Sequence, residues 1–182
     1  MGKYDPSVHH RHSIRLKGYD YSQTGLYFVT MNTQYRLHLF GQIREGLMVL
    51  SPAGEMVRNE WMVLPGRFEC VFLHEFIVMP DHFHGIVEIR APVGAALVAA
   101  QLNREGGERA GTRPARTLGD MMGAFKSLTT HKYIQGVREA GWPPFHKRLW
   151  QRNYYEHIIR SEKAYHNIAA YIRNNPARWQ EK

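Results

Sequence analysis

The chain has 182 residues, of which 43% are hydrophobic, which is enough for one hydrophobic core and favours a single domain over two. Lys and Arg number 24 against 16 Asp and Glu, and the resulting net charge of +8 favours a polyanionic partner. No stretch approaches the roughly 20 apolar residues of a membrane span, and the N-terminus lacks the apolar segment of a secretory signal. We therefore expect a cytoplasmic protein with no membrane association.

The first segment, residues 1–24, is basic and aromatic without hydrophobic periodicity. It predicts an N-terminal arm whose cations, Arg11, Arg15 and Lys17 among them, suit contact with phosphates and whose tyrosines suit base stacking. The alternative is a solvated tail without a partner.

Two strand-like stretches follow, residues 25–33 and 38–50. Both are rich in β-branched and aromatic residues, and the second is broken by Gly41 and Gly46. This pattern predicts a first strand and its neighbour, with a tight turn.

A helix and a strand pair are predicted next. Ser51-Pro52 is a typical helix start, and Pro65-Gly66 a typical stop. Residues 69–79 and 82–90 are strand-like runs joined by Pro80-Asp81, a connector too short for anything but an antiparallel turn.

The rest of the chain predicts a loop, two helices and a strand. Residues 91–116, rich in Ala, Gly, Arg and Pro, predict a flexible surface loop. Helical periodicity then covers 117–141 and 161–176, on either side of a strand-like run at 148–160. The order β-β-α-β-β-α-β-α predicts one α+β domain over residues 1–182, a ferredoxin-like (RRM-like) antiparallel sheet with helices packed mainly on one face.

Two histidines stand at the start of the predicted inner strand. Side chains alternate along a strand, so His82 and His84 point to one face while Phe83 points to the other and joins the core. Two imidazoles so placed indicate a metal-ligand pair that needs a third donor. Because the chain has 11 histidines, a chance pair on a sheet surface is the alternative.

The last helix supplies the further donors. Tyr171 and Asn175 lie one helical turn apart, which puts a phenol and an amide oxygen side by side within reach of a cation held by the histidines. The alternative is a packing tyrosine and a helix-end asparagine before proline. The two residues flank the apolar stripe Tyr165, Ile168, Ala169 and Ile172.

These elements together resemble a known family. The segments RLKGYDYSQTGLYFVTMNT, MPDHFHGIVEI, LGDMMGAFKSLTT, LWQRNYYEHIIR and YIRNNP are similar to those of the single-tyrosine HUH transposases that act on single-stranded DNA, in particular the REP-associated tyrosine transposases. The resemblance covers about residues 11–178.

The resemblance implies a catalytic tyrosine at Tyr171 and metal ligands at His82, His84 and Asn175, with Mg²⁺ or Mn²⁺ as the cofactor. Ligand chemistry alone leaves Zn²⁺ open. The implied reaction is attack by Tyr171 on a phosphodiester, which gives a 5′-phosphotyrosine and a free 3′-hydroxyl. Tyr154 and Tyr155 are weaker candidates, because neither has a ligand four residues later.

The implied target is single-stranded DNA with a hairpin element, bound by a monomer or a homodimer. The N-terminal arm, together with Lys126 and Lys132 of the 117–141 helix, could hold its phosphates, although a solvated charged face is the alternative for each lysine. We expect the four tryptophans to lie in the core or to be partly buried rather than to stack on bases. Two other functions remain open: a non-catalytic nucleic-acid-binding module, and a metal-dependent phosphoesterase in which water attacks.

Overall fold

The computed structural model describes residues 23–90 and 117–179. Residues 1–22 of the predicted arm, with Arg11, Arg15 and Lys17, and the predicted 91–116 loop lie outside the described residues. The helices and strands in chain order are β1 (Gly25–Asn32), η1 (Gln34–Arg36), β2 (Gly41–Arg44), β3 (Leu47–Leu50), α1 (Pro52–Met62), α2 (Leu64–Arg67), β4 (Val71–Met79), β5 (His82–Ile89), α4 (Leu118–Ala140), β6 (Tyr155–Ile159), α5 (Glu162–Arg173) and η2 (Pro176–Arg178). In this part of the chain, no helix is long and apolar enough to cross a membrane.

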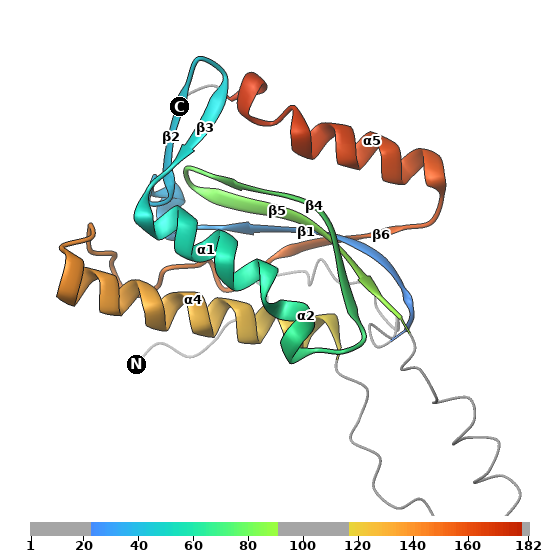
Figure 1. Cartoon of the computed structure of the whole chain (residues 1–182), viewed down its shortest axis with the longest axis horizontal. Helices are drawn as coiled ribbons and strands as arrows, with labels where there is room; N and C mark the ends of the chain where they lie inside the picture. The colour runs from blue at the N-terminus through green and yellow to red at the C-terminus, as the bar shows by residue number, and fades with distance from the viewer. Residues whose placement is uncertain (1–22, 91–116, 180–182) are drawn as a thin grey trace, which may run out of the picture.

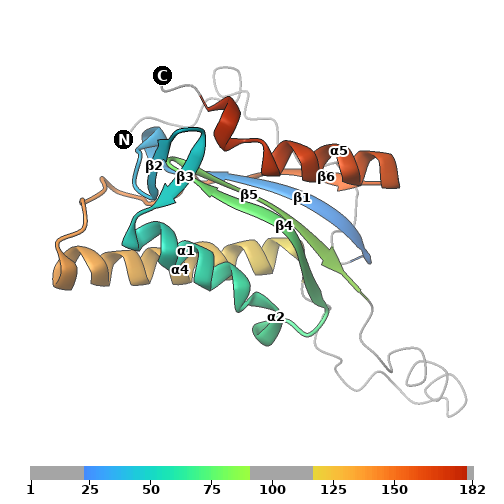
Figure 2. The same ribbon diagram turned by 45° about the horizontal axis from the view of Figure 1, so that its top comes forward.

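A four-stranded antiparallel sheet in the order β4-β5-β1-β6 forms the centre of the fold (Figure 1). Helices α1 and α4 lie against one face, and α5 lies against the other (Figure 2). This arrangement confirms the predicted α+β class with an antiparallel sheet. It also places the predicted histidine strand, β5, between β4 and β1.

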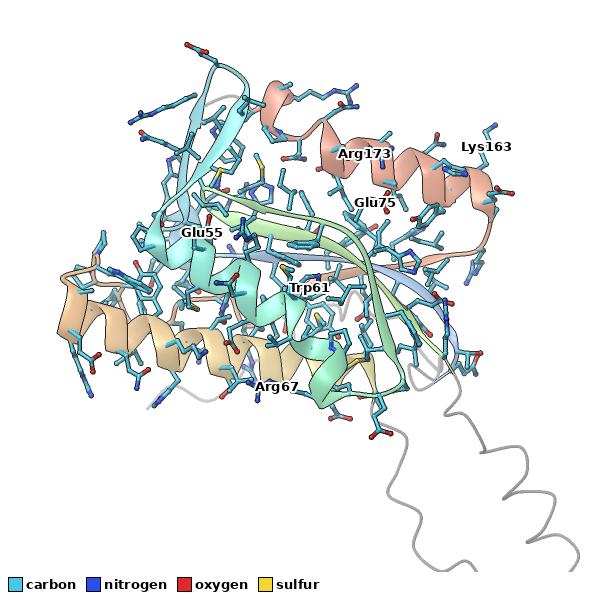
Figure 3. All side chains as sticks on the ribbon, in the orientation of Figure 1. Glu55, Trp61, Arg67, Glu75, Lys163 and Arg173 are labelled. Carbon is cyan, nitrogen blue, oxygen red and sulfur yellow. The ribbon has the colours of Figure 1, made fainter. Side chains whose placement is uncertain are left out.

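The alternation of side chains along the strands divides the core in two. Trp61 points from α1 toward the sheet (Figure 3). Its ring packs on Phe83 with centroids 4.5 Å apart and on Phe125 of α4 at 5.4 Å. The α5 face carries a smaller cluster, consisting of Phe28, Ile86, Ile159, Ala169 and Ile172. Burial of its phenylalanine and isoleucine side chains, worth about 1.5–3 kcal/mol each, stabilises the packing of α5 on the sheet.

The 38–50 segment differs from the prediction. Strands β2 and β3 pair with each other in a separate two-stranded sheet, and neither is a neighbour of β1. The reason is that β5 and β6 already occupy both hydrogen-bonding edges of β1. The β2–β3 hairpin instead stands beyond the end of the sheet, beside the C-terminal end of α5 (Figure 1).

The last strand is shorter than the predicted 148–160 run. Strand β6 begins at Tyr155, and before it Trp150 makes an isolated bridge to Thr33. Trp150 is held by a hydrogen bond from its indole nitrogen to Thr129 Oγ1 of α4, at 2.8 Å. This anchor holds the segment before β6 between α4 and the end of β1, where the Gln151 N–H donates to the Asn32 carbonyl at 2.9 Å.

Two glycines in helices give a test of the packing. A Cβ at Gly54 in α1 would lie 2.1 Å from the carbonyl oxygen of Phe40, whereas a Cβ at Gly123 in α4 would meet no described atom within 4 Å. We expect Gly54→Ala to lower the free energy of unfolding by about 1–3 kcal/mol through overpacking. Gly123→Ala should raise it by about 0.5–1 kcal/mol through helix propensity. Urea unfolding of both variants measures these changes in the free energy of unfolding. Changes of the same sign in the two variants would contradict this packing of α1.

Candidate functional site

A cavity of about 750 Å³ opens at the end of the sheet where β1 ends and β5 begins. Its walls come from these two strands, from η1, and from the C-terminal end of α5 with the residues that follow it. The lining residues are Thr30, Asn32, Tyr35, Arg36, His38, Asp81, His82, His84, Tyr171, Asn175, Arg178 and Trp179. The four residues predicted from the sequence as catalytic or metal-ligating therefore line one cavity.

The two histidines of β5 lie on the same face of the sheet, as strand alternation predicts. The ring centroids of His82 and His84 are 4.6 Å apart, while Phe83 between them is fully buried in the core on the opposite face. Both imidazoles are themselves nearly buried, with 5% and 4% of the residue exposed.

Polar neighbours fix the orientation of both rings. Nδ1 of His82 donates to Asp81 Oδ1 at 2.5 Å, and Nδ1 of His84 is 2.8 Å from Thr30 Oγ1. Asp81 is held in turn by Arg36, whose Nε lies 2.7 Å from Oδ2. With each Nδ1 engaged, Nε2 is the nitrogen that each ring has available as a metal ligand.

The electrostatics of the cavity keep His84 neutral. Burial lowers the pKa of His84 to about 3, and the electrostatic interactions with His82 and Arg36 act in the same direction. A neutral imidazole is the form that coordinates a cation. His84 is thus suited to be a ligand rather than an acid.

Tyr171 brings its hydroxyl to the same histidine. Its Oη lies 3.3 Å from His84 Nε2, and its ring packs edge-on against Phe28 at 6.2 Å between centroids. Tyr171 is 43% exposed, so the hydroxyl is reachable from solvent. A phenol that is both positioned and accessible can act as a nucleophile on a bound substrate.

Asn175 follows the end of α5 instead of lying within it. The helix ends at Arg173 because Pro176 has no N–H to donate to the Ile172 carbonyl, and Asn175 keeps a helical backbone conformation with its own N–H bonded to that carbonyl at 3.2 Å. Because of this additional helical turn, Asn175 lines the same cavity as Tyr171, four residues earlier in the chain, in agreement with the predicted i, i+4 spacing.

Contacts to β4 position the helix that carries Tyr171. Arg173 and Glu75 point toward one another (Figure 3), with Nη1 2.7 Å from Oε1. Tyr165 donates its hydroxyl to the other carboxylate oxygen of Glu75, at 2.7 Å. The hydrogen bond from Tyr165, with the charge of Arg173, holds the pKa of Glu75 below its usual value.

Two imidazoles and an amide oxygen in the cavity could hold a divalent cation, and this donor set leaves open which one. Within 23–90 and 117–179, no group of three or more His, Cys, Asp or Glu side chains is placed to hold a metal ion. Besides the two histidines, the cavity offers the amide oxygen of Asn175, a donor that suits a hard divalent cation. Asp81 is already engaged by His82 and Arg36.

The two lysines predicted to bind DNA lie away from this cavity. Both belong to α4, on the opposite side of the sheet, and neither lines the cavity. Lys126 donates to the carbonyls of Gln151 and Arg152, and Lys132 pairs with the buried Glu60.

Sequence reasoning missed several residues of the cavity. Trp179 stacks on His82 with ring centroids 5.6 Å apart, although tryptophan composition favours core positions. Tyr35 and Arg36 reach the cavity because both have a positive φ, 59° and 56°, in the turn after β1. No periodic pattern in the sequence signals such a turn. Tyr155, the rival tyrosine, is exposed on β6 and does not line the cavity.

Comparisons with known proteins were made for the sequence and for the structure. No family model matches the chain. A protein of Haemophilus influenzae described as uncharacterized is 39% identical over 183 residues, covering 98% of this chain and 95% of that protein. A REP-associated tyrosine transposase solved bound to a REP hairpin superposes with a TM-score of 0.46 at 19% identity, over 97% of this chain and 73% of the other. A candidate transposase from Deinococcus radiodurans gives 0.44 at 16% identity, over 88% and 95%.

Proposed function

This chain belongs to the same family as the Haemophilus influenzae protein, and we propose that it is a metal-dependent transposase that cleaves and rejoins single-stranded DNA next to hairpin elements. The observation that carries the proposal is the placement of an accessible tyrosine hydroxyl 3.3 Å from one of two paired, nearly buried histidines. The sequence resemblance to single-tyrosine HUH transposases points to the same four residues.

In the proposed reaction, Tyr171 Oη attacks the phosphorus of a phosphodiester. The bond between phosphorus and the 3′-oxygen breaks, the 3′-oxygen leaves as a hydroxyl after taking up a proton, and the 5′-phosphate remains on the tyrosine. The phosphotyrosine keeps the energy of the phosphodiester, so that a 3′-hydroxyl can reverse the reaction and rejoin DNA without ATP.

The residues of the cavity supply position and charge. His82, His84 and Asn175 would hold Mg²⁺ or Mn²⁺, which would polarise the phosphate and stabilise the charge on its oxygens. Arg36 and Arg178 line the cavity and give it positive charge for a phosphate. Trp179 and Tyr35 offer aromatic surfaces for unpaired bases beside that phosphate.

Two differently labelled substrates test the proposal. The native protein is incubated with Mn²⁺ and hairpin-bearing single-stranded DNA from its own genomic flank, labelled at the 3′ end or the 5′ end. The proposed chemistry leaves the 3′-labelled fragment attached to protein on a denaturing gel, and the 5′-labelled fragment free and shortened. Cleavage without a protein adduct would indicate hydrolysis by water instead. Binding without cleavage of any supplied hairpin would indicate a non-catalytic module.

The Asp81 carboxylate gives a prediction for the metal. Asp81→Asn keeps the size of the side chain but weakens the acceptor that orients His82, so we expect Mn²⁺ affinity to fall by about 10–100-fold. Glu88→Gln is the matched control, because Glu88 makes a similar carboxylate–imidazole contact to His74 at 3.0 Å, outside the cavity. Calorimetric titration of Mn²⁺ compares the two variants, and equal affinities would contradict the role of Asp81.

A further inference from the structure

A second concave surface lies beside α4. We name it the α4 groove; it is about 440 Å³ in volume and lies between α4 and residues 147–152. Its charged lining consists of Lys126, Lys147, Arg148 and Arg152, with His131 beside them, and no Asp or Glu lines it. Four cations with no lining carboxylate make a site for an anion with several charges.

The cations on the 147–152 side are available to a ligand. Arg148, Arg152 and Lys147 are exposed, and among the described carboxylates none forms an ion pair with them. By contrast, Arg58 and Arg173 each pair with a glutamate. The groove therefore holds positive charge that the described fold leaves uncompensated.

Lys126 at the floor of the groove is partly satisfied by the fold. Its ammonium group donates to the carbonyls of Gln151 and Arg152, at 2.6 and 3.1 Å, which uses two of its three N–H groups. Burial lowers the pKa of Lys126 to about 8. A bound anion would favour the charged form of this lysine.

The backbone that carries these cations is rigidly held. Leu149 and Trp150 are buried, and the Leu149 carbonyl accepts from the N–H of Gln34 at 2.8 Å. At the entrance, Lys147 has a φ of 61° inside a tight turn closed by the Arg148 N–H and the His146 carbonyl at 2.7 Å. Such strained conformations of non-glycine residues concentrate at functional sites.

The wall of the α4 groove is hydrogen-bonded to the wall of the cavity that contains Tyr171. The N–H of Gln151, which lines the groove, donates to the carbonyl of Asn32, which lines the cavity, at 2.9 Å. One hydrogen bond thus connects the two walls. A DNA strand that leaves the cavity around the end of β1 would pass Gln151 and reach the groove.

We infer that the α4 groove binds the backbone phosphates of single-stranded DNA that extends out of the cavity. The inference rests on the proposed function for the identity of the ligand. It also accounts for Lys126, which lines the groove and not the cavity. Arg148 and Arg152 are its phosphate-binding residues, because they are exposed on a segment that the core fixes in place.

Charge reversal tests the groove. Binding of a single-stranded oligonucleotide of about 16 nucleotides is measured by fluorescence anisotropy, with chelator present so that no cleavage occurs. We expect Arg148→Glu/Arg152→Glu to weaken binding at least about tenfold at moderate salt and to reduce the slope of log affinity against log salt by about 1.4, or 0.7 for each lost phosphate contact. The neutral pair Arg148→Gln/Arg152→Gln should fall between this variant and the native protein.

The control makes the same change of charge elsewhere. Arg160 and Lys163 are exposed where β6 meets α5 and do not line the cavity, and Lys163 lies at the opposite end of α5 from Arg173 (Figure 3). Arg160→Glu/Lys163→Glu should reduce affinity much less. Equal losses of affinity in the two double variants, or no DNA binding by the native protein, would refute the proposal that the α4 groove binds DNA. If Arg148→Glu/Arg152→Glu weakened DNA binding but the native protein formed no tyrosine adduct, the proposed function would be refuted and the DNA-binding role of the groove would be kept.

Discussion

Tyr171→Phe is expected to abolish the covalent protein–DNA adduct and to lower the rate of strand cleavage by at least about 10³-fold, because the attacking oxygen is removed. The variant should fold normally. The phenylalanine ring can keep the edge-on contact with Phe28 and the ring contact with His84, whose centroid lies 5.2 Å away. The contact of the hydroxyl with His84 Nε2 is lost, and at 43% exposure that loss costs little stability.

Tyr155→Phe is the matched control for this variant. Tyr155 is 45% exposed and also contacts Phe28 edge-on, at 6.4 Å, but it belongs to β6 and does not line the cavity. Adduct formation should continue in this variant at the native rate. If Tyr171→Phe kept the adduct and Tyr155→Phe lost it, the nucleophile would be reassigned to β6.

Much of the fold follows from local patterns in the sequence. Ser51, Thr117 and Ser161 were expected at helix starts, and each accepts a hydrogen bond from the backbone N–H three residues later. The period of two placed His82 and His84 on one face and Phe83 on the other. These features depend on neighbours in the chain, which is why they can be predicted from a single sequence.

The features that the sequence did not predict depend on distant partners. Strands β2 and β3 have ordinary strand composition, and their exclusion from the main sheet reflects the pairing of β1 with β5 and β6. Lys132 has the spacing of an exposed helix residue, but Glu60 of α1 lies within reach of it. Pairing choice and ion-pair partners are tertiary properties, and local periodicity does not encode them.

In the cavity, too, some residues are placed by local sequence patterns and others by tertiary contacts. Asn175 and Tyr171 were placed by helical spacing, whereas Arg36 enters through a turn with positive φ and acts on His82 through Asp81. This chain of contacts from Arg36 to His82 fixes the orientation of the imidazole whose Nε2 we propose as a metal ligand. Such preorganisation supports the proposed metal-ligand pair over two histidines that only share a sheet surface.

His84→Phe is expected to lower Mn²⁺ affinity by more than about 100-fold, beyond the effect of a residue that only orients a ligand. Phenylalanine has a similar shape, so that the stacking of the ring on Phe28, at 5.4 Å between centroids, can be kept. The variant loses Nε2, the nitrogen next to Tyr171 Oη, and with it one of the two imidazole ligands. Adduct formation should therefore also be lost, although Tyr171 itself is intact.

His74→Phe separates this effect from the general loss of a histidine. His74 lies on β4 and contacts Glu88 and Tyr165 at the outer part of the sheet, where it does not line the cavity. Its replacement should leave Mn²⁺ affinity and adduct formation unchanged while removing the same number of ring nitrogens. The two variants are compared by Mn²⁺ titration and by the labelled-DNA gel. Unchanged metal affinity in His84→Phe would refute the histidine pair as the metal site, and a lost adduct in that case would mean that His84 acts on Tyr171 directly.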